Sequence, residues 1–202
     1  MDSIYDFIVK PIGGRYNNTK KVGDKTLVTN TSIEDFRSVN NEAVVVGLPR
    51  AIKTPISKGD TIVVHHNLFR RFYDIRGDQK NSRSFVDENT YLCSPDQIYL
   101  YKSNDGEWET FDDRCFVQPL VNKSDLTTLN TESNVGVMRH TNKSLESKGI
   151  SNGDIVYFKN GREFKFVIDN RLTYCMKSND IILKHGYKRN KEDYNPSWVS
   201  SG

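Results

Sequence analysis

Short apolar runs alternate with polar stretches along the whole chain. The runs are rich in valine, isoleucine, threonine and aromatic residues, which favour β-strands. No long segment has the apolar spacing of an amphipathic helix. The pattern therefore predicts an all-β fold, with strands at residues 7–12, 42–47, 61–64, 68–75, 89–93, 97–102, 115–120, 135–140, 154–159, 163–168, 172–176 and 180–184.

Three sequence blocks occur twice and in the same order. The paired blocks are 7–12 with 115–120, 56–60 with 150–154, and 90–93 with 173–176. Ordered repetition of this kind is typical of a tandem duplication, and 202 residues suit two domains of about 100 residues each. We expect a first domain at 1–102, a linker at 103–112, a second domain at 113–184 and a polar tail at 185–202.

The second copy is shorter than the first in two places, which identifies two loops. One difference falls in the polar stretch after the first strand. The other falls at residues 76–86 of the first copy. The longest polar stretch, residues 14–41, has few apolar residues, and a long segment without predicted structure in a compact domain is either functional or disordered. We expect it to be the most mobile internal segment of the chain.

Composition argues against several classes of protein. The net charge of +3, from 29 basic and 26 acidic residues, is too balanced to indicate a nucleic-acid or membrane surface. The three cysteines form neither a pairing pattern nor a metal-ligand motif, so no disulfide, metal or cofactor is expected and the setting is a reducing cytosol. Neither a signal peptide nor an apolar membrane-spanning run is recognisable.

Few side chains indicate chemistry. The run Arg70-Arg71-Phe72-Tyr73 interleaves basic and aromatic residues, as single-strand nucleic-acid binders do, but ordinary alternation on a strand explains it equally. His65 and His66 are expected on opposite faces of a strand, which argues against joint metal binding. Cys93 and Cys175 are expected in the core. No nucleophile motif or paired carboxylates are present, so no catalytic residues are predicted and an enzyme is not expected.

Several segments together resemble co-chaperonins of the GroES type. Asp-Arg-Cys-Phe-Val-Gln-Pro at 113–119 resembles the opening strand of that family. The Gly-Asp strands at 58–64 and 152–158 resemble its central strand. The segment 174–182 resembles its closing strand. The resemblance covers both copies, and it rests on the order and repetition of motifs that are individually weak.

The resemblance implies two tandem GroES-like irregular β-barrels that cap a GroEL-like chaperonin ring. Members form homo-oligomeric rings, usually heptamers, and the chaperonin hydrolyses the ATP. A loop after the first strand carries a short hydrophobic motif that docks on the chaperonin. By register this motif is Thr26, Leu27 and Val28, although Thr26 departs from the family's aliphatic residue. Ile33 and Phe36 are the alternative anchors in the same loop.

The shorter second copy is expected to lack a competent docking loop. Two other functions remain open: an oligomeric structural or assembly protein that keeps the fold without chaperonin binding, and a single-stranded nucleic-acid-binding barrel. The divergent sequence favours a bacteriophage or bacterial origin. A phage-encoded protein of this kind would act in the host cytoplasm.

Overall fold

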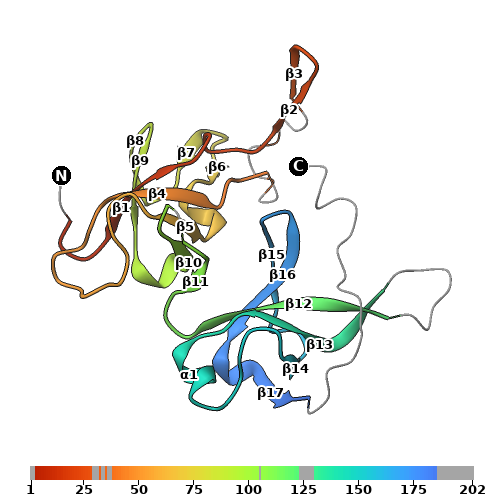
Figure 1. The fold of residues 1–202 in the computed structure, drawn as a ribbon. Coiled ribbons are helices and arrows are strands. Elements are labelled where there is room, and N and C mark those ends of the chain that lie inside the picture. The colour runs from red at the N-terminus through yellow and green to blue at the C-terminus, as the bar shows by residue number, and fades with distance from the viewer. Residues whose placement is uncertain are drawn as a thin grey trace. The chain divides into compact units, whose positions relative to one another are not determined.

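The computed structural model describes residues 3–28, 32, 35, 38–104, 106–122 and 130–185. The chain divides into two compact units, Met1–Trp108 and Glu109–Gly202. Regular structure in the described residues is almost entirely β, with a single four-residue α-helix, so the predicted all-β class is confirmed (Figure 1). The sheets formed by the described residues are open and do not close into barrels.

The first unit contains one main antiparallel sheet and two separate hairpins. The main sheet has the strand order β10-β5-β4-β1-β9-β8, and the hairpins are β2-β3 and β6-β7. Its elements are β1 (Phe7–Pro11), β2 (Thr19–Val22), β3 (Lys25–Val28), β4 (Glu42–Gly47), β5 (Thr61–Val64), η1 (His66–Leu68), β6 (Arg71–Tyr73), β7 (Gln79–Asn81), β8 (Phe85–Asp87), β9 (Thr90–Cys93), η2 (Pro95–Gln97) and β10 (Ile98–Lys102).

The second unit contains one six-stranded antiparallel sheet, in the order β17-β14-β13-β12-β16-β15. Its elements are β11 (Glu109–Thr110), β12 (Arg114–Asn122), β13 (Asn130–His140), α1 (Lys143–Glu146), β14 (Ile155–Phe158), β15 (Phe164–Ile168), β16 (Arg171–Lys177), η3 (Ser178–Asp180) and β17 (Ile181–Lys184). The helices of the described residues are all too short to cross a membrane.

The main sheets of the two units have the same strand order and the same register. Val9 on β1 lies opposite Tyr91 on β9, and Val117 on β12 lies opposite Tyr174 on β16. The opening strand of each sheet also pairs with a second neighbour, β4 or β13. In both pairings the register shifts immediately before this valine. The repeated sequence blocks therefore occupy equivalent positions in the two sheets.

The turn before β5 recurs before β14 with the same hydrogen bonds. The carboxylate of Asp60 accepts a hydrogen bond from the backbone N–H of Ser57 at 2.8 Å, and the carboxylate of Asp154 accepts one from Ser151 at 2.7 Å. The glycine before each aspartate has a positive φ, 95° and 89°, which favours glycine. In each unit, a side-chain hydrogen bond to the backbone three residues earlier thus closes the turn before β5 or β14.

Apolar residues from both faces of each opening strand fill the interior of its unit. The buried residues of the first unit include Phe7, Val9, Ile62, Phe69, Tyr91 and Leu100. The main cluster of the second unit includes Cys115, Val117, Met138, Val156, Tyr174 and Met176. The thiols of Cys93 and Cys175 are buried, as expected, and burial raises the pKa of Cys175 to about 12. These thiols are therefore structural rather than reactive.

The strand expected at 68–75 is wrong in its bounds. Its first residue ends the short helix η1, and only β6 is extended. The chain then reverses because the carboxylate of Asp74 accepts hydrogen bonds from the backbone N–H groups of Arg76 and Asp78, at 2.9 and 3.0 Å. This turn joins β6 to β7, so the polar run at 76–86 forms part of a hairpin.

A glycine at the centre of the second sheet leads to a stability prediction. Gly136 lies opposite Pro119, and an added Cβ would contact the Val117 side chain and lie 2.5 Å from the Gln118 carbonyl oxygen. Gly136→Ala should therefore lower the free energy of unfolding by about 2 kcal/mol, since the strands must separate. Urea denaturation followed by circular dichroism measures this loss.

The first unit provides the matched control, because Ala43 occupies the equivalent place opposite Pro11. Ala43→Gly should reduce stability by only about 1 kcal/mol, the usual effect of glycine in a strand. A Gly136→Ala variant as stable as the unsubstituted chain would contradict the close approach of β12 and β13.

Candidate functional site

The candidate docking motif lies on a β-hairpin that extends from the first unit (Figure 1). Strands β2 and β3 pair from Thr19 opposite Val28 to Val22 opposite Lys25. The two residues between the strands begin with Gly23 at φ +60°, the conformation that a tight primed turn requires. The sequence predicted no regular structure in segment 14–41. That prediction is wrong for residues 19–28, which form a hairpin around this glycine.

The hairpin exposes aliphatic side chains at both of its ends, Val22 beside the turn and Leu27 and Val28 at the end of β3 farthest from the turn. Leu27 is 51% exposed, Val28 is 61% exposed and Val22, on β2, is 55% exposed. Thr26 is exposed as well. Leu27 and Val28 point to opposite faces of the strand, and at these exposed fractions the described residues cover neither face. The predicted anchors thus lie together on one short strand and remain accessible.

The alternative anchors Ile33 and Phe36 lie outside the described residues, as do Leu126 and Leu129 of the second copy. The anchoring role of Ile33 and Phe36 stays a prediction from the sequence. Leu126 and Leu129 are apolar residues of the shorter segment that follows the first strand of the second copy, which is expected not to dock.

The two chain segments at the root of the hairpin are paired with each other. Tyr16 forms an antiparallel bridge with Val39, and the backbone N–H of Asn17 donates to the Ser38 carbonyl at 2.8 Å. Val39 is buried. The Tyr16 hydroxyl also accepts a hydrogen bond from the backbone N–H of Arg71 at 2.8 Å. The hairpin is therefore attached to the unit through an ordered base.

Arg15 joins this base to the body of the first unit. Its Nε and Nη2 donate to the Phe69 carbonyl at 3.2 and 3.1 Å, and its Nη1 donates to Asn81 Oδ1 at 2.9 Å. The guanidinium also lies over the rings of Phe85 and Tyr91, 5.4 and 5.5 Å from their centroids. One side chain thus combines three hydrogen bonds with two cation–π contacts.

Asn40 fixes the opposite side of the base. Its buried side-chain amide donates to the carbonyls of Ile12 and Gly14, at 2.6 and 2.8 Å. Its Oδ1 accepts from the backbone N–H of Glu42 at 2.9 Å. The main sheet does not satisfy these backbone groups, which lie where the chain leaves β1 and enters β4. The Asn40 side chain satisfies them instead.

The sequence did not identify Arg15 or Asn40 as functional residues. The contacts of Arg15 bring together the two segments that are longer in the first copy than in the second: the segment after the first strand, and the hairpin β6-β7 with its flanking residues. We therefore assign the positioning of the β2-β3 hairpin to Arg15.

The expectation that His65 and His66 lie on opposite faces of a strand is wrong. A helical turn begins here, and His65 Nδ1 accepts the backbone N–H of Asn67 at 3.1 Å, which brings the two imidazoles into a stack with centroids 4.3 Å apart. Burial, with smaller contributions from His65 and Arg70, lowers the pKa of His66 to about 4. His66 is therefore neutral at pH 7.

This shift predicts acid sensitivity. The pKa of His66 is lower in the folded than in the unfolded chain, where it is about 6.5, so the neutral side chain favours folding above pH 6.5 and that stability is lost as the pH falls toward 4. His66→Gln should flatten this part of the stability profile. Urea midpoints of both proteins across this range test it, and parallel profiles would contradict the assignment.

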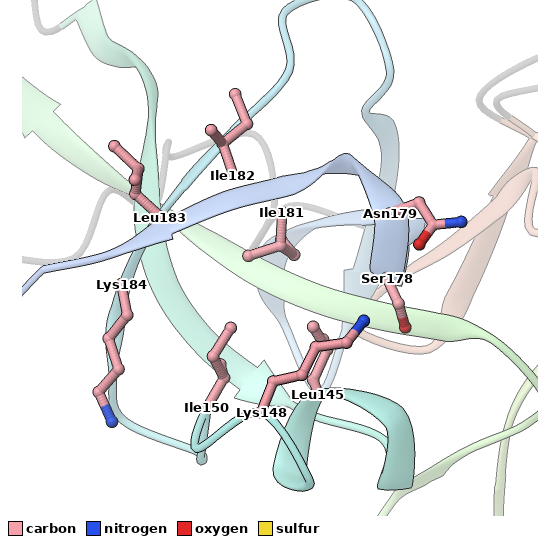
Figure 2. A pocket seen from close by; sticks show the side chains of 9 residues that line it. All are labelled: Leu145, Lys148, Ile150, Ser178, Asn179, Ile181, Ile182, Leu183 and Lys184. Atoms are coloured by element: carbon pink, nitrogen blue, oxygen red, sulfur yellow. The ribbon is translucent and has the colours of Figure 1, made fainter.

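A surface cavity with a volume of about 400 Å³ lies in the second unit (Figure 2). Leu145, Ile150 and Ile181 line it with mainly aliphatic side chains, and its ionisable side chains are Lys148 and Lys184. Lys184 forms a salt bridge with Asp154, in which Nζ lies 2.6 Å from Oδ2. This lining contains no pair of acid and base groups, and it suggests no reaction.

No cluster of three or more histidine, cysteine, aspartate or glutamate side chains that could hold a metal ion is found in the part of the chain that the structure describes. The hairpin of the first unit is therefore the best-supported candidate site. A scan of protein-family models and a search of curated proteins find no match to this sequence.

Proposed function

We propose that this protein is a co-chaperonin of the GroES type, which caps a GroEL-like chaperonin ring through the β2-β3 hairpin and assists ATP-dependent protein folding. The observation that carries the proposal is the pair of exposed aliphatic residues Leu27 and Val28 on a projecting hairpin. Thr26 precedes them on the same strand. The chaperonin supplies the ATP hydrolysis, and this chain supplies the docking contacts.

The energetics of docking fit a weak contact that is repeated around a ring. Burying Leu27 and Val28 on a partner is worth about 3 kcal/mol together, which is too little for stable binding by one subunit. Several hairpins on one oligomer raise the avidity without new contacts. An ordered hairpin base also lowers the entropic cost of docking relative to a fully disordered loop.

The matching sheets of the two units support the second part of the proposal, that the chain contains two tandem GroES-like domains. Both follow one strand order, and both begin the central strand after the same aspartate-capped turn. In this proposal the subunits form a homo-oligomeric ring, a heptamer by analogy with the family. The first domain docks and the second serves assembly.

Association with a chaperonin tests the proposal directly. The purified protein should be retained by an immobilised GroEL-like ring in the presence of ATP or ADP, and released when nucleotide is omitted. Native mass spectrometry of the free protein should give a ring. A stable ring that never binds a chaperonin under any nucleotide condition would instead support an assembly protein.

A further inference from the structure

A second, polar cavity lies in the first unit, with a volume of about 270 Å³. It lies at the end of the β6-β7 hairpin nearest to η1 and η2. The residues around it are Asn67, Arg70, Phe72, Ser82, Arg83, Ser84 and Gln97. Two of these are arginines and none is acidic, so the cavity has a strong excess of hydrogen-bond donors.

One donor in the cavity wall lacks a partner within the described residues. Arg70 Nε is buried and makes no hydrogen bond, which is unusual for a group that carries positive charge. Gln97 is held from the other side, because its Oε1 accepts the backbone N–H of Ser94 at 3.2 Å. Its NH₂ group is therefore left to donate elsewhere. The Ser82 hydroxyl donates to the Leu68 carbonyl at 2.6 Å and fixes the wall at that point.

The local charge favours an anion. Asp74 and Asp78, the carboxylates of the β6-β7 turn, both pair with Lys80, at 3.6 and 3.8 Å. The negative charge of these carboxylates therefore compensates Lys80 and not the two arginines of the cavity. The positive charge of Arg70 also reaches His66, whose pKa it helps to lower. Positive charge that is partly withdrawn from water, with no carboxylate lining the same cavity, attracts oxyanions.

We propose that this cavity binds a phosphate group, which Arg70 and Arg83 contact as cations and which the neighbouring amides contact as donors. The planar guanidinium has the fork geometry that phosphate oxygens accept. Phe72, 39% exposed in the cavity wall, offers a face on which a nucleobase can stack. The phosphate can thus come from inorganic phosphate or from a mononucleotide. This site is independent of chaperonin docking.

Isothermal titration calorimetry of the full-length protein with inorganic phosphate and with AMP tests the site. We expect saturable binding, weakened about tenfold or more in both Arg70→Lys and Arg83→Ala, since each removes a charge-assisted hydrogen bond or its geometry. Arg76→Ala removes a cation from the turn of the same hairpin that does not line the cavity, and it should change affinity less than about twofold. Amide chemical shifts should move at Asn67 and Ser84.

The experiment also separates the two sources of phosphate. Tighter binding of AMP than of phosphate, lost in Phe72→Leu, assigns a nucleotide site, and equal binding assigns a site for the phosphate group alone. Equal weakening by Arg76→Ala and Arg83→Ala would overturn the proposal in favour of diffuse charge attraction. If neither phosphate nor AMP binds saturably, the proposal is also overturned. That holds even if a single-stranded oligonucleotide binds to the protein. Arg83 is exposed, so its variant should fold normally.

Discussion

Replacing Leu27 and Val28 together by aspartate is expected to abolish chaperonin binding and to leave the oligomer intact. Both side chains are more than half exposed in the free protein, so their replacement removes little native packing. On docking, two aliphatic contacts worth about 3 kcal/mol would become two charges that an apolar groove cannot solvate. Because the change repeats in every subunit, the loss of avidity exceeds the loss at one site.

Refolding of a chaperonin-dependent substrate measures the effect, with a native-mass check on each variant. Leu126→Asp with Leu129→Asp is the matched control, since it places the same charges in the corresponding segment of the second copy. We expect this control to reduce capping much less. If it lost capping while the Leu27/Val28 variant kept it, the docking role would belong to the second copy.

The features that the sequence predicted are those determined locally. The central strands follow a glycine with positive φ and an aspartate that caps its own turn, Gly59-Asp60 and Gly153-Asp154, and both groups are visible as residue types. The alternation of apolar residues likewise located the strands of both main sheets except β8, which begins in the polar run expected to be a loop. Local chemistry of this kind repeats wherever the motif repeats. It explains why equivalent strands could be predicted in both copies from the sequence.

The missed features depend on contacts between distant segments. Arg15 donates two hydrogen bonds to the carbonyl of Phe69, and a backbone carbonyl leaves no mark in the sequence because every residue has one. The stacking of His65 on His66 was missed for a related reason. A helical turn interrupts the strand pattern there, and its hydrogen bond to Asn67 overrides the alternation expected of a strand.

The arrangement around Arg15 suggests why the first copy is longer in two places. The segment after its first strand carries the hairpin with Leu27 and Val28. The β6-β7 hairpin supplies Asn81, one of the acceptors that hold the base of that hairpin. A docking hairpin and its support would therefore be expected to occur together. The second copy is shorter in both places.

Arg15→Ala is therefore expected to release the β2-β3 hairpin from the first unit. The substitution removes three hydrogen bonds and two cation–π contacts and leaves the Phe69 carbonyl without this donor. We expect the first unit to lose about 3 kcal/mol of stability, in the range for breaking a partly buried hydrogen-bonded cluster. Arg15→Lys should recover only part of this, because an ammonium cannot reproduce the planar fork.

Hydrogen exchange measured by mass spectrometry tests this positioning role separately from chaperonin binding. In Arg15→Ala, amides of residues 16–28 and 38–40 should exchange faster while those of β12 and β16 stay unchanged, and chaperonin affinity should fall about tenfold as the ordering cost of docking returns. Arg162→Ala, an exposed arginine of the second unit, controls for the lost charge. Unchanged exchange at the hairpin base would rule out Arg15 as its anchor, whether or not the protein binds a chaperonin.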